Sequence, residues 1–187
     1  MDIAHSTALF LHILGAFALA VANGLELLLL RGLSRGRASD FPVYSEQYRL
    51  LPALGGGGLG VILLTGLFLM FTGLGAQAWI VTALVSVVVI GALGAWSGIP
   101  QRRAMVAAAQ APSDEARLAA LRDWRFAFSN RLRIALMLGI LALMVFKPEM
   151  LGAAIVMVVA AGAGLAWAAE GMSSRTGTGT RAATLGR

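Results

Sequence analysis

Long apolar blocks alternate along this chain with short segments that are rich in arginine. Crossing about 30 Å of hydrocarbon takes about 20 apolar residues in a helix, and five of the blocks approach or exceed that length. The pattern therefore predicts an all-α fold, a polytopic transmembrane helical bundle with about five spans. The spans are expected at about 6–30, 51–74, 77–99, 132–146 and 150–169.

The remaining segments connect the spans or follow the last one. We expect one transmembrane domain over 1–172 and a disordered cytoplasmic tail over 173–187, where glycine and threonine alternate. The stretch from Asp114 to Phe128 places apolar side chains on one face and arginines on the other, which predicts a short helix at the membrane interface. Ser113 precedes two acidic residues, a combination that favours a helix start through capping and the helix dipole.

The distribution of arginine predicts how the bundle is oriented. Arginines lie after the first span, between the third and fourth spans, and in the tail. In the connections on the other side, Lys147 is the only basic residue. Since basic residues collect in cytoplasmic loops, the N-terminus is expected outside and the C-terminus inside.

Composition agrees with a membrane protein and excludes several other classes. Of the 187 residues, 58% are hydrophobic and 13% are charged, whereas a soluble domain is about 45–50% apolar and about 25% charged. The formal charge of +6 follows from the basic loops, and no aromatic residues interleave with a basic patch as nucleic-acid binding requires. The lipid bilayer is the expected partner, and nucleic-acid binding is not expected. The absence of cysteine excludes disulfides and thiolate chemistry.

The two histidines both lie on the first span. His5 and His12 are seven residues apart, so they share one helix face at about 10 Å along the axis. That spacing argues against one metal ion held by both, and no metal site is predicted. Two interpretations stay open: His12 hydrogen-bonds within the bundle, or it serves as a ligand or in proton transfer. A haem would need His12 with a methionine, an open position or a second copy of the chain.

Other polar residues in the spans are few, and each is a candidate for function. Asn23 and Glu26 lie one turn apart on the first span. Glu26 either reaches the inner interface or pairs with an arginine there, or it is one end of a polar path along the span. Lys147 is either an interfacial anchor before Pro148 or part of an outer polar rim. Catalytic residues remain unknown, because no Ser/His/Asp set or zinc motif is present, which argues against hydrolytic and zinc enzymes.

Glycines within the spans are expected to serve helix packing, since small residues let helix backbones approach closely. The run from Gly55 to Gly58 has two interpretations: it serves the same packing, or it marks a hinge or a close-approach site at a helix entry. It is not a phosphate-binding loop, because no GK[ST] follows it.

Three segments carry a resemblance to known families: LFLHILGAFALAVANG around His12, LLTGLFLMFTG with the later AWI, and RLRIALMLGILALMVFKP. They resemble a bacterial family of predicted integral membrane proteins of unknown function. That family is similar to the copper-resistance D membrane domain and to the small membrane protoporphyrinogen oxidase. The resemblance implies a bundle in the bacterial inner membrane that is associated with haem or a metal, with His12 as the residue that transfers. The oxidase pairs its histidine with a lysine on a middle span, whereas Lys147 ends the fourth span here.

Three functional hypotheses follow from these patterns. The first is a small inner-membrane protein that binds haem b through His12, with His5 as a second candidate ligand. The second is a non-enzymatic accessory or assembly subunit, either as a homo-oligomer or in a larger membrane complex. The third is a small transporter or proton path along Asn23, Glu26 and His12.

Overall fold

A computed structural model describes residues 3–35, 41–121 and 123–184 of the chain, and all regular elements in this part are helices. Within these described ranges, five helices are long and apolar enough to cross a membrane: α1, α2, α3, α5 and α6. The prediction of an all-α protein with five candidate spans is confirmed. The elements are α1 (Ile3–Arg35), α2 (Phe41–Leu69), the π-helix η2 (Met70–Leu74), α3 (Ala78–Ala109), α4 (Asp114–Ala120), α5 (Trp124–Phe146) and α6 (Met150–Thr184).

The helices are longer than the apolar blocks that predicted them. α2 begins ten residues before the predicted start at 51 and contains Pro52, and α3 continues through Pro100 past the predicted end at 99. Proline removes one backbone hydrogen bond, but membrane bundles tolerate it because neighbouring groups satisfy the freed carbonyl. The assignment of α6 to Thr184 also includes most of the stretch predicted as a disordered tail.

The prediction of one continuous interfacial helix from Asp114 to Phe128 is wrong. The segment is divided into α4 and the first turns of α5. The expected start at Ser113 is confirmed, because its side chain accepts a hydrogen bond from the Ala116 amide. The division follows from a second cap, since the Asp123 carboxylate accepts from the Arg125 amide at 2.9 Å and starts a new helix.

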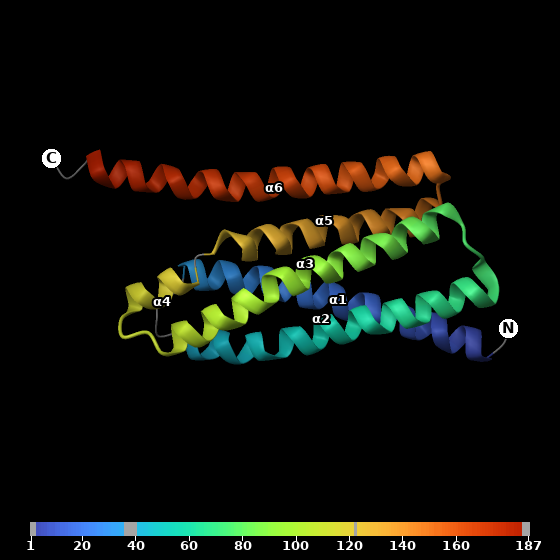
Figure 1. The fold of residues 1–187 in the computed structure, drawn as a ribbon, viewed down its shortest axis with the longest axis horizontal. Coiled ribbons are helices and arrows are strands. Elements are labelled where there is room, and N and C mark those ends of the chain that lie inside the picture. Colours follow the sequence, from blue (N-terminus) through green and yellow to red (C-terminus); the bar gives the residue numbers. More distant parts are fainter. Residues whose placement is uncertain (1–2, 36–40, 122, 185–187) are drawn as a thin grey trace.

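The long helices run side by side, with α6 along one edge of the bundle (Figure 1). α1 packs mainly on α2, α3 packs mainly on α5, and α6 rests on α5. We call the end where α1 begins and α5 turns into α6 the amino end. The opposite end, where α3 passes into α4, is the arginine-rich end (Figure 1).

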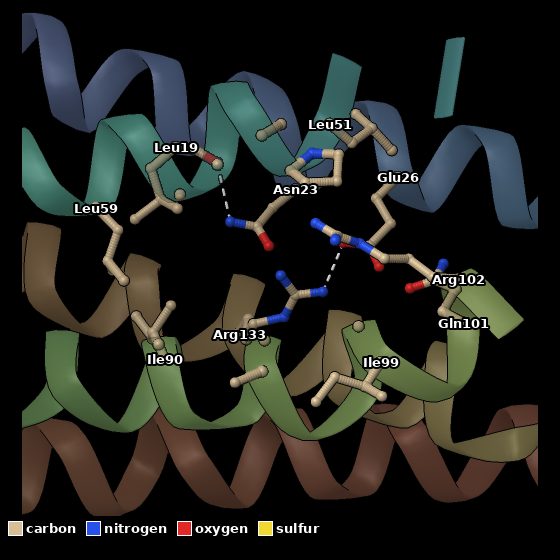
Figure 2. A pocket seen from close by; sticks show the side chains of 18 of the residues that line it. Leu19, Asn23, Glu26, Leu51, Leu59, Ile90, Ile99, Gln101, Arg102 and Arg133 are labelled. Carbon is tan, nitrogen blue, oxygen red and sulfur yellow. Dashed lines mark hydrogen bonds and ion pairs between the residues drawn. The ribbon is translucent and has the colours of Figure 1, made fainter. Parts of the chain in front are cut away.

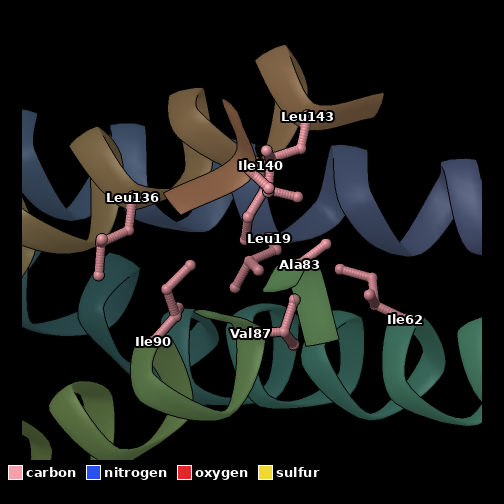
Figure 3. Close-up of a cluster of buried hydrophobic side chains, with 9 residues drawn as sticks. Leu19, Ile62, Ala83, Val87, Ile90, Leu136, Ile140 and Leu143 are labelled. Carbon is pink, nitrogen blue, oxygen red and sulfur yellow. The ribbon is translucent and has the colours of Figure 1, made fainter. Parts of the chain in front are cut away.

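A buried apolar cluster holds the middle of the bundle together (Figure 3). Large apolar side chains also cover much of the outside, including Phe10, Phe17, Leu64 and Val158. A surface of this kind suits lipid and not water. The cluster consists of Leu19, Ile62, Ala83, Val87, Ile90, Leu136, Ile140, Leu143 and Ala153.

Glycines bring neighbouring helices into close contact at two interfaces. A Cβ atom on Gly58 would lie 2.9 Å from the carbonyl oxygen of Gly15, so α1 and α2 nearly touch there. A Cβ on Gly139 or Gly164 would meet side chains across the α5–α6 interface at 2.8 and 2.9 Å. The packing interpretation is therefore confirmed for Gly58, which lies well inside α2. Gly162 makes no such contact.

Candidate functional site

Four polar side chains from α1 and α5 meet near the arginine-rich end. Asn23 and Glu26 are buried on α1, with 1% and 7% of their surfaces exposed. Arg133 donates from Nη2 to Glu26 Oε2 at 2.5 Å. Asn130 donates from Nδ2 to the same carboxylate oxygen at 3.2 Å and to the backbone carbonyl of Asn23 at 3.0 Å. A buried ion pair with amide support therefore joins α1 to α5, the first and fourth of the five long helices.

This arrangement answers one of the questions left open for Glu26. Its carboxylate pairs with an arginine, but that arginine lies inside the bundle on α5 and not in a loop. Sequence reasoning missed Arg133 and Asn130 because it began the fourth span at 132 and assigned both residues to the preceding connection or its edge. Helical spacing was a usable signal, because 130 and 133 lie one turn apart and match the spacing of Asn23 and Glu26.

A second buried polar contact joins α3 to α5. Ser97 donates to Ser129 Oγ at 2.9 Å, and Ser129 donates to the Leu93 carbonyl at 2.9 Å. Gln101, one turn after Ser97, is also buried. Nothing in the sequence singled out these three residues, because serine and glutamine are uncharged and occur often in helices.

A cavity of about 340 Å³ lies between α1, α2, α3 and α5, and we call it the polar cavity (Figure 2). Its volume falls within the range of about 300–1,000 Å³ that is usual for ligand sites. Apolar residues line the side nearer the amino end, including Leu59 and Ile90 (Figure 2). The polar residues that line it are Asn23, Glu26, Tyr48, Gln101, Arg102 and Arg133.

A second cavity, of about 290 Å³, lies nearer the amino end, and we call it the His12 cavity. Its walls are mostly apolar and come from α1, α2, η2 and α3, with residues from the end of α5. Besides His12, its lining includes the thioethers of Met70 and Met144, the Trp79 ring and Lys147.

The hydrogen bonds around His12 favour one tautomer of its ring. His12 Nδ1 lies 3.1 Å from Thr65 Oγ1, and that hydroxyl donates its own proton to the Val61 carbonyl at 2.5 Å. With that proton donated to Val61, the Thr65 oxygen accepts from the imidazole, an assignment that places the hydrogen on Nδ1. The neutral ring then has its lone pair on Nε2. The ring lies against Gly66, where a Cβ would be 3.1 Å from His12 Cε1.

The structure separates the remaining predicted residues into two groups. Lys147 ends α5 in the left-handed backbone region, at φ 47°, and lines the cavity that contains His12. Asn23 and Glu26 line the polar cavity, and the buried apolar cluster contributes walls to both cavities and divides them. His5 is not among the residues that line the His12 cavity, and it packs against Gly73 instead.

Among the described residues, no three His, Cys, Asp or Glu side chains are grouped so as to hold a metal ion. Two features are candidates for function: the His12 imidazole in a mostly apolar cavity, and the buried Glu26–Arg133 ion pair in the polar cavity. In comparisons with known proteins, the chain matches no protein-family model, no curated protein and no solved structure.

Proposed function

We propose that this multi-pass membrane protein binds haem b and that His12 would ligate its iron. The observation that carries the proposal is the His12–Thr65 hydrogen bond in an apolar cavity. Histidines that bind metals almost always donate their other ring N–H to an acceptor, which fixes the tautomer and the ring orientation. Thr65 serves His12 in this way and leaves Nε2 as the ligating atom.

Among the described residues that line the His12 cavity, one histidine would ligate the haem iron. The described lining contains a single imidazole, and the thioethers of Met70 and Met144 are the other soft donors. Histidine and methionine are both established haem ligands. Lys147 brings a cationic side chain that suits a propionate. The exposed positions of Leu9 and Lys147 leave the rim open. Haem held there would supply a redox-active iron.

Replacing His12 by alanine is expected to abolish the Soret band of the purified protein. The measurement is an absorption spectrum after expression with haem supplied. His5→Ala is the matched control, because that histidine lies on the same helix face but outside the cavity, and its spectrum should resemble the wild type.

Thr65→Val serves as a second variant in the same experiment, because it keeps the shape of the side chain and removes the acceptor. Loss of a supporting partner of this kind costs about 10–100-fold in metal affinity. A wild-type protein without the band, or a band unchanged in His12→Ala, would contradict the proposal.

We also propose that the N-terminus is outside and the C-terminus inside, in the bacterial inner membrane. The arginine distribution supports this orientation. Cysteine substitutions test it cleanly because the chain has no cysteine of its own. Ala76 lies between η2 and α3, and Gln110 directly follows α3. In intact spheroplasts, a membrane-impermeant maleimide should label Ala76→Cys. It should label Gln110→Cys only when the cells are lysed. The opposite pattern would reverse the orientation.

The polar-path alternative gains little from the described contacts. His12 and Glu26 line different cavities, and apolar residues of the core cluster lie between those cavities. Glu26 is committed to an ion pair with Arg133. The haem proposal is therefore the one that the geometry supports best.

A further inference from the structure

We propose that the polar cavity binds one anionic phospholipid, whose head group carries a single phosphodiester charge and hydroxyl donors. This inference is independent of the haem proposal. It concerns the polar cavity between α1, α2, α3 and α5. Four observations support it: the charges of the lining residues, an unpaired buried oxygen, two glycines that make no helix contact, and the depth of the polar groups in the membrane.

Among the described residues that line the polar cavity, the charges leave one positive charge without a counter-charge. Arg102 and Arg133 stand against the single carboxylate of Glu26, and Arg133 already pairs with it. Figure 2 shows the Arg102 side chain extending from α3 toward the side of the cavity where Glu26 lies. A ligand with one negative charge would balance the cavity. Gln101 and Tyr48 add polar groups at the same end.

An unmet hydrogen-bond acceptor points to a ligand that also donates. Asn23 is 1% exposed, and its Nδ2 donates to the Leu19 carbonyl at 2.8 Å, whereas its buried Oδ1 has no hydrogen-bond partner. Figure 2 shows this oxygen directed from α1 toward the space beside Arg133. Leaving such an atom unpaired costs about 1–3 kcal/mol. A hydroxyl on the head group would donate a hydrogen bond to Asn23 Oδ1. A choline head group has no such hydroxyl.

Glycines keep this cavity open without serving helix packing. Gly56 and Gly98 both line it, and a Cβ built on either residue meets no atom within 4 Å. Close helix contact therefore does not account for these two glycines, unlike Gly58. Gly56, Ala95 and Ile99 are exposed cavity-lining residues on α2 and α3. The cavity thus opens sideways between these helices, where acyl chains can pass into the bilayer.

The depth of the polar groups matches the head-group level. Gly98 follows the first residue of α3, Ala78, by twenty positions, which is about 30 Å along a helix and equals the hydrocarbon thickness. Glu26 lies at a similar distance along α1 from its start at Ile3. The polar end of the cavity therefore lies where phosphates of one leaflet are found.

The test compares binding of phosphatidylglycerol and phosphatidylcholine by native mass spectrometry of the full-length protein in mild detergent. Phosphatidylglycerol should bind at least about fivefold more tightly, as expected for one basic residue near an anionic head group. Gly98→Leu should fill the cavity and remove this preference, and Arg102→Gln should reduce it about fivefold. Gly60→Leu is the matched control, because a Cβ at Gly60 also meets no atom within 4 Å and the residue does not line the cavity.

Thermal stability without added lipid shows that each variant is folded. Equal binding of the two lipids, or an unchanged preference in both Gly98→Leu and Arg102→Gln, would overturn the proposal. Soluble glycerol phosphate forms a further arm, and binding as tight as that of phosphatidylglycerol would assign the site to a free anion and overturn the lipid assignment.

Discussion

Glu26→Leu is expected to lower the free energy of unfolding by about 3–5 kcal/mol, because it leaves the Arg133 guanidinium buried without its carboxylate. The side chains of Arg133 and Glu26 are 12% and 9% exposed, so water replaces little of the lost interaction. The measurement is unfolding in mixed detergent micelles. This is the largest single effect that we expect from the polar residues.

The two halves of the ion pair should not be equivalent. In Arg133→Met, the isolated carboxylate can take up a proton and become neutral, whereas a guanidinium stays charged. Arg133→Met should therefore destabilise the protein less than Glu26→Leu. The double variant should be less destabilised than the Glu26→Leu single variant, since apolar replacements of a buried pair are often tolerated. Additive losses in the double variant would show that the two residues do not act as a pair.

Gly58→Leu should separate α1 from α2 and destabilise the protein by about 1–3 kcal/mol or more, as overpacking does. Its Cβ would lie 2.9 Å from the Gly15 carbonyl oxygen and 3.0 Å from the Leu19 amide nitrogen. Both atoms belong to the backbone, so no side-chain rotation relieves the contact. The same unfolding measurement detects the loss.

The neighbouring residue gives a matched control for this prediction. A Cβ on Gly57 meets no atom within 4 Å and the residue is exposed. Gly57→Leu should therefore be neutral or stabilising by up to about 1 kcal/mol, because leucine is the better helix former. Equal effects at the two positions would show that helix contact is not what Gly58 provides.

The number and type of helices were predictable because apolar block length is a local property of the sequence. The helix ends were not, because polar and amphipathic residues extend several helices beyond the hydrocarbon. The start of α5 depends on the Asp123 cap, and its early turns contain arginine and asparagine that resemble a loop in composition. Because the predicted start of this helix was too late, sequence reasoning did not identify Asn130 and Arg133, the two α5 residues that contact Glu26.

The sequence identified single residues of the candidate site but not the residues that contact them. His12, Asn23 and Glu26 stood out because polar groups are rare in spans. Their partners did not, since Thr65 is 53 residues from His12, and Arg133 is 107 residues from Glu26. A single sequence does not pair such distant residues, even where two segments show the same one-turn spacing of polar residues. The lateral opening beside Gly56 and Gly98 likewise depends on how α2 and α3 pack.

The ion pair between α1 and α5 also has a consequence for the order of events during synthesis. Glu26 is made 107 residues before Arg133, which is roughly 5–20 s at a translation rate of about 5–20 residues per second. During that interval the ribosome has delivered α1, α2 and α3, but not the helix that supplies the counter-ion. The nascent chain therefore passes through a stage in which Glu26 lacks its Arg133 partner, and the synthesis of α5 ends that stage.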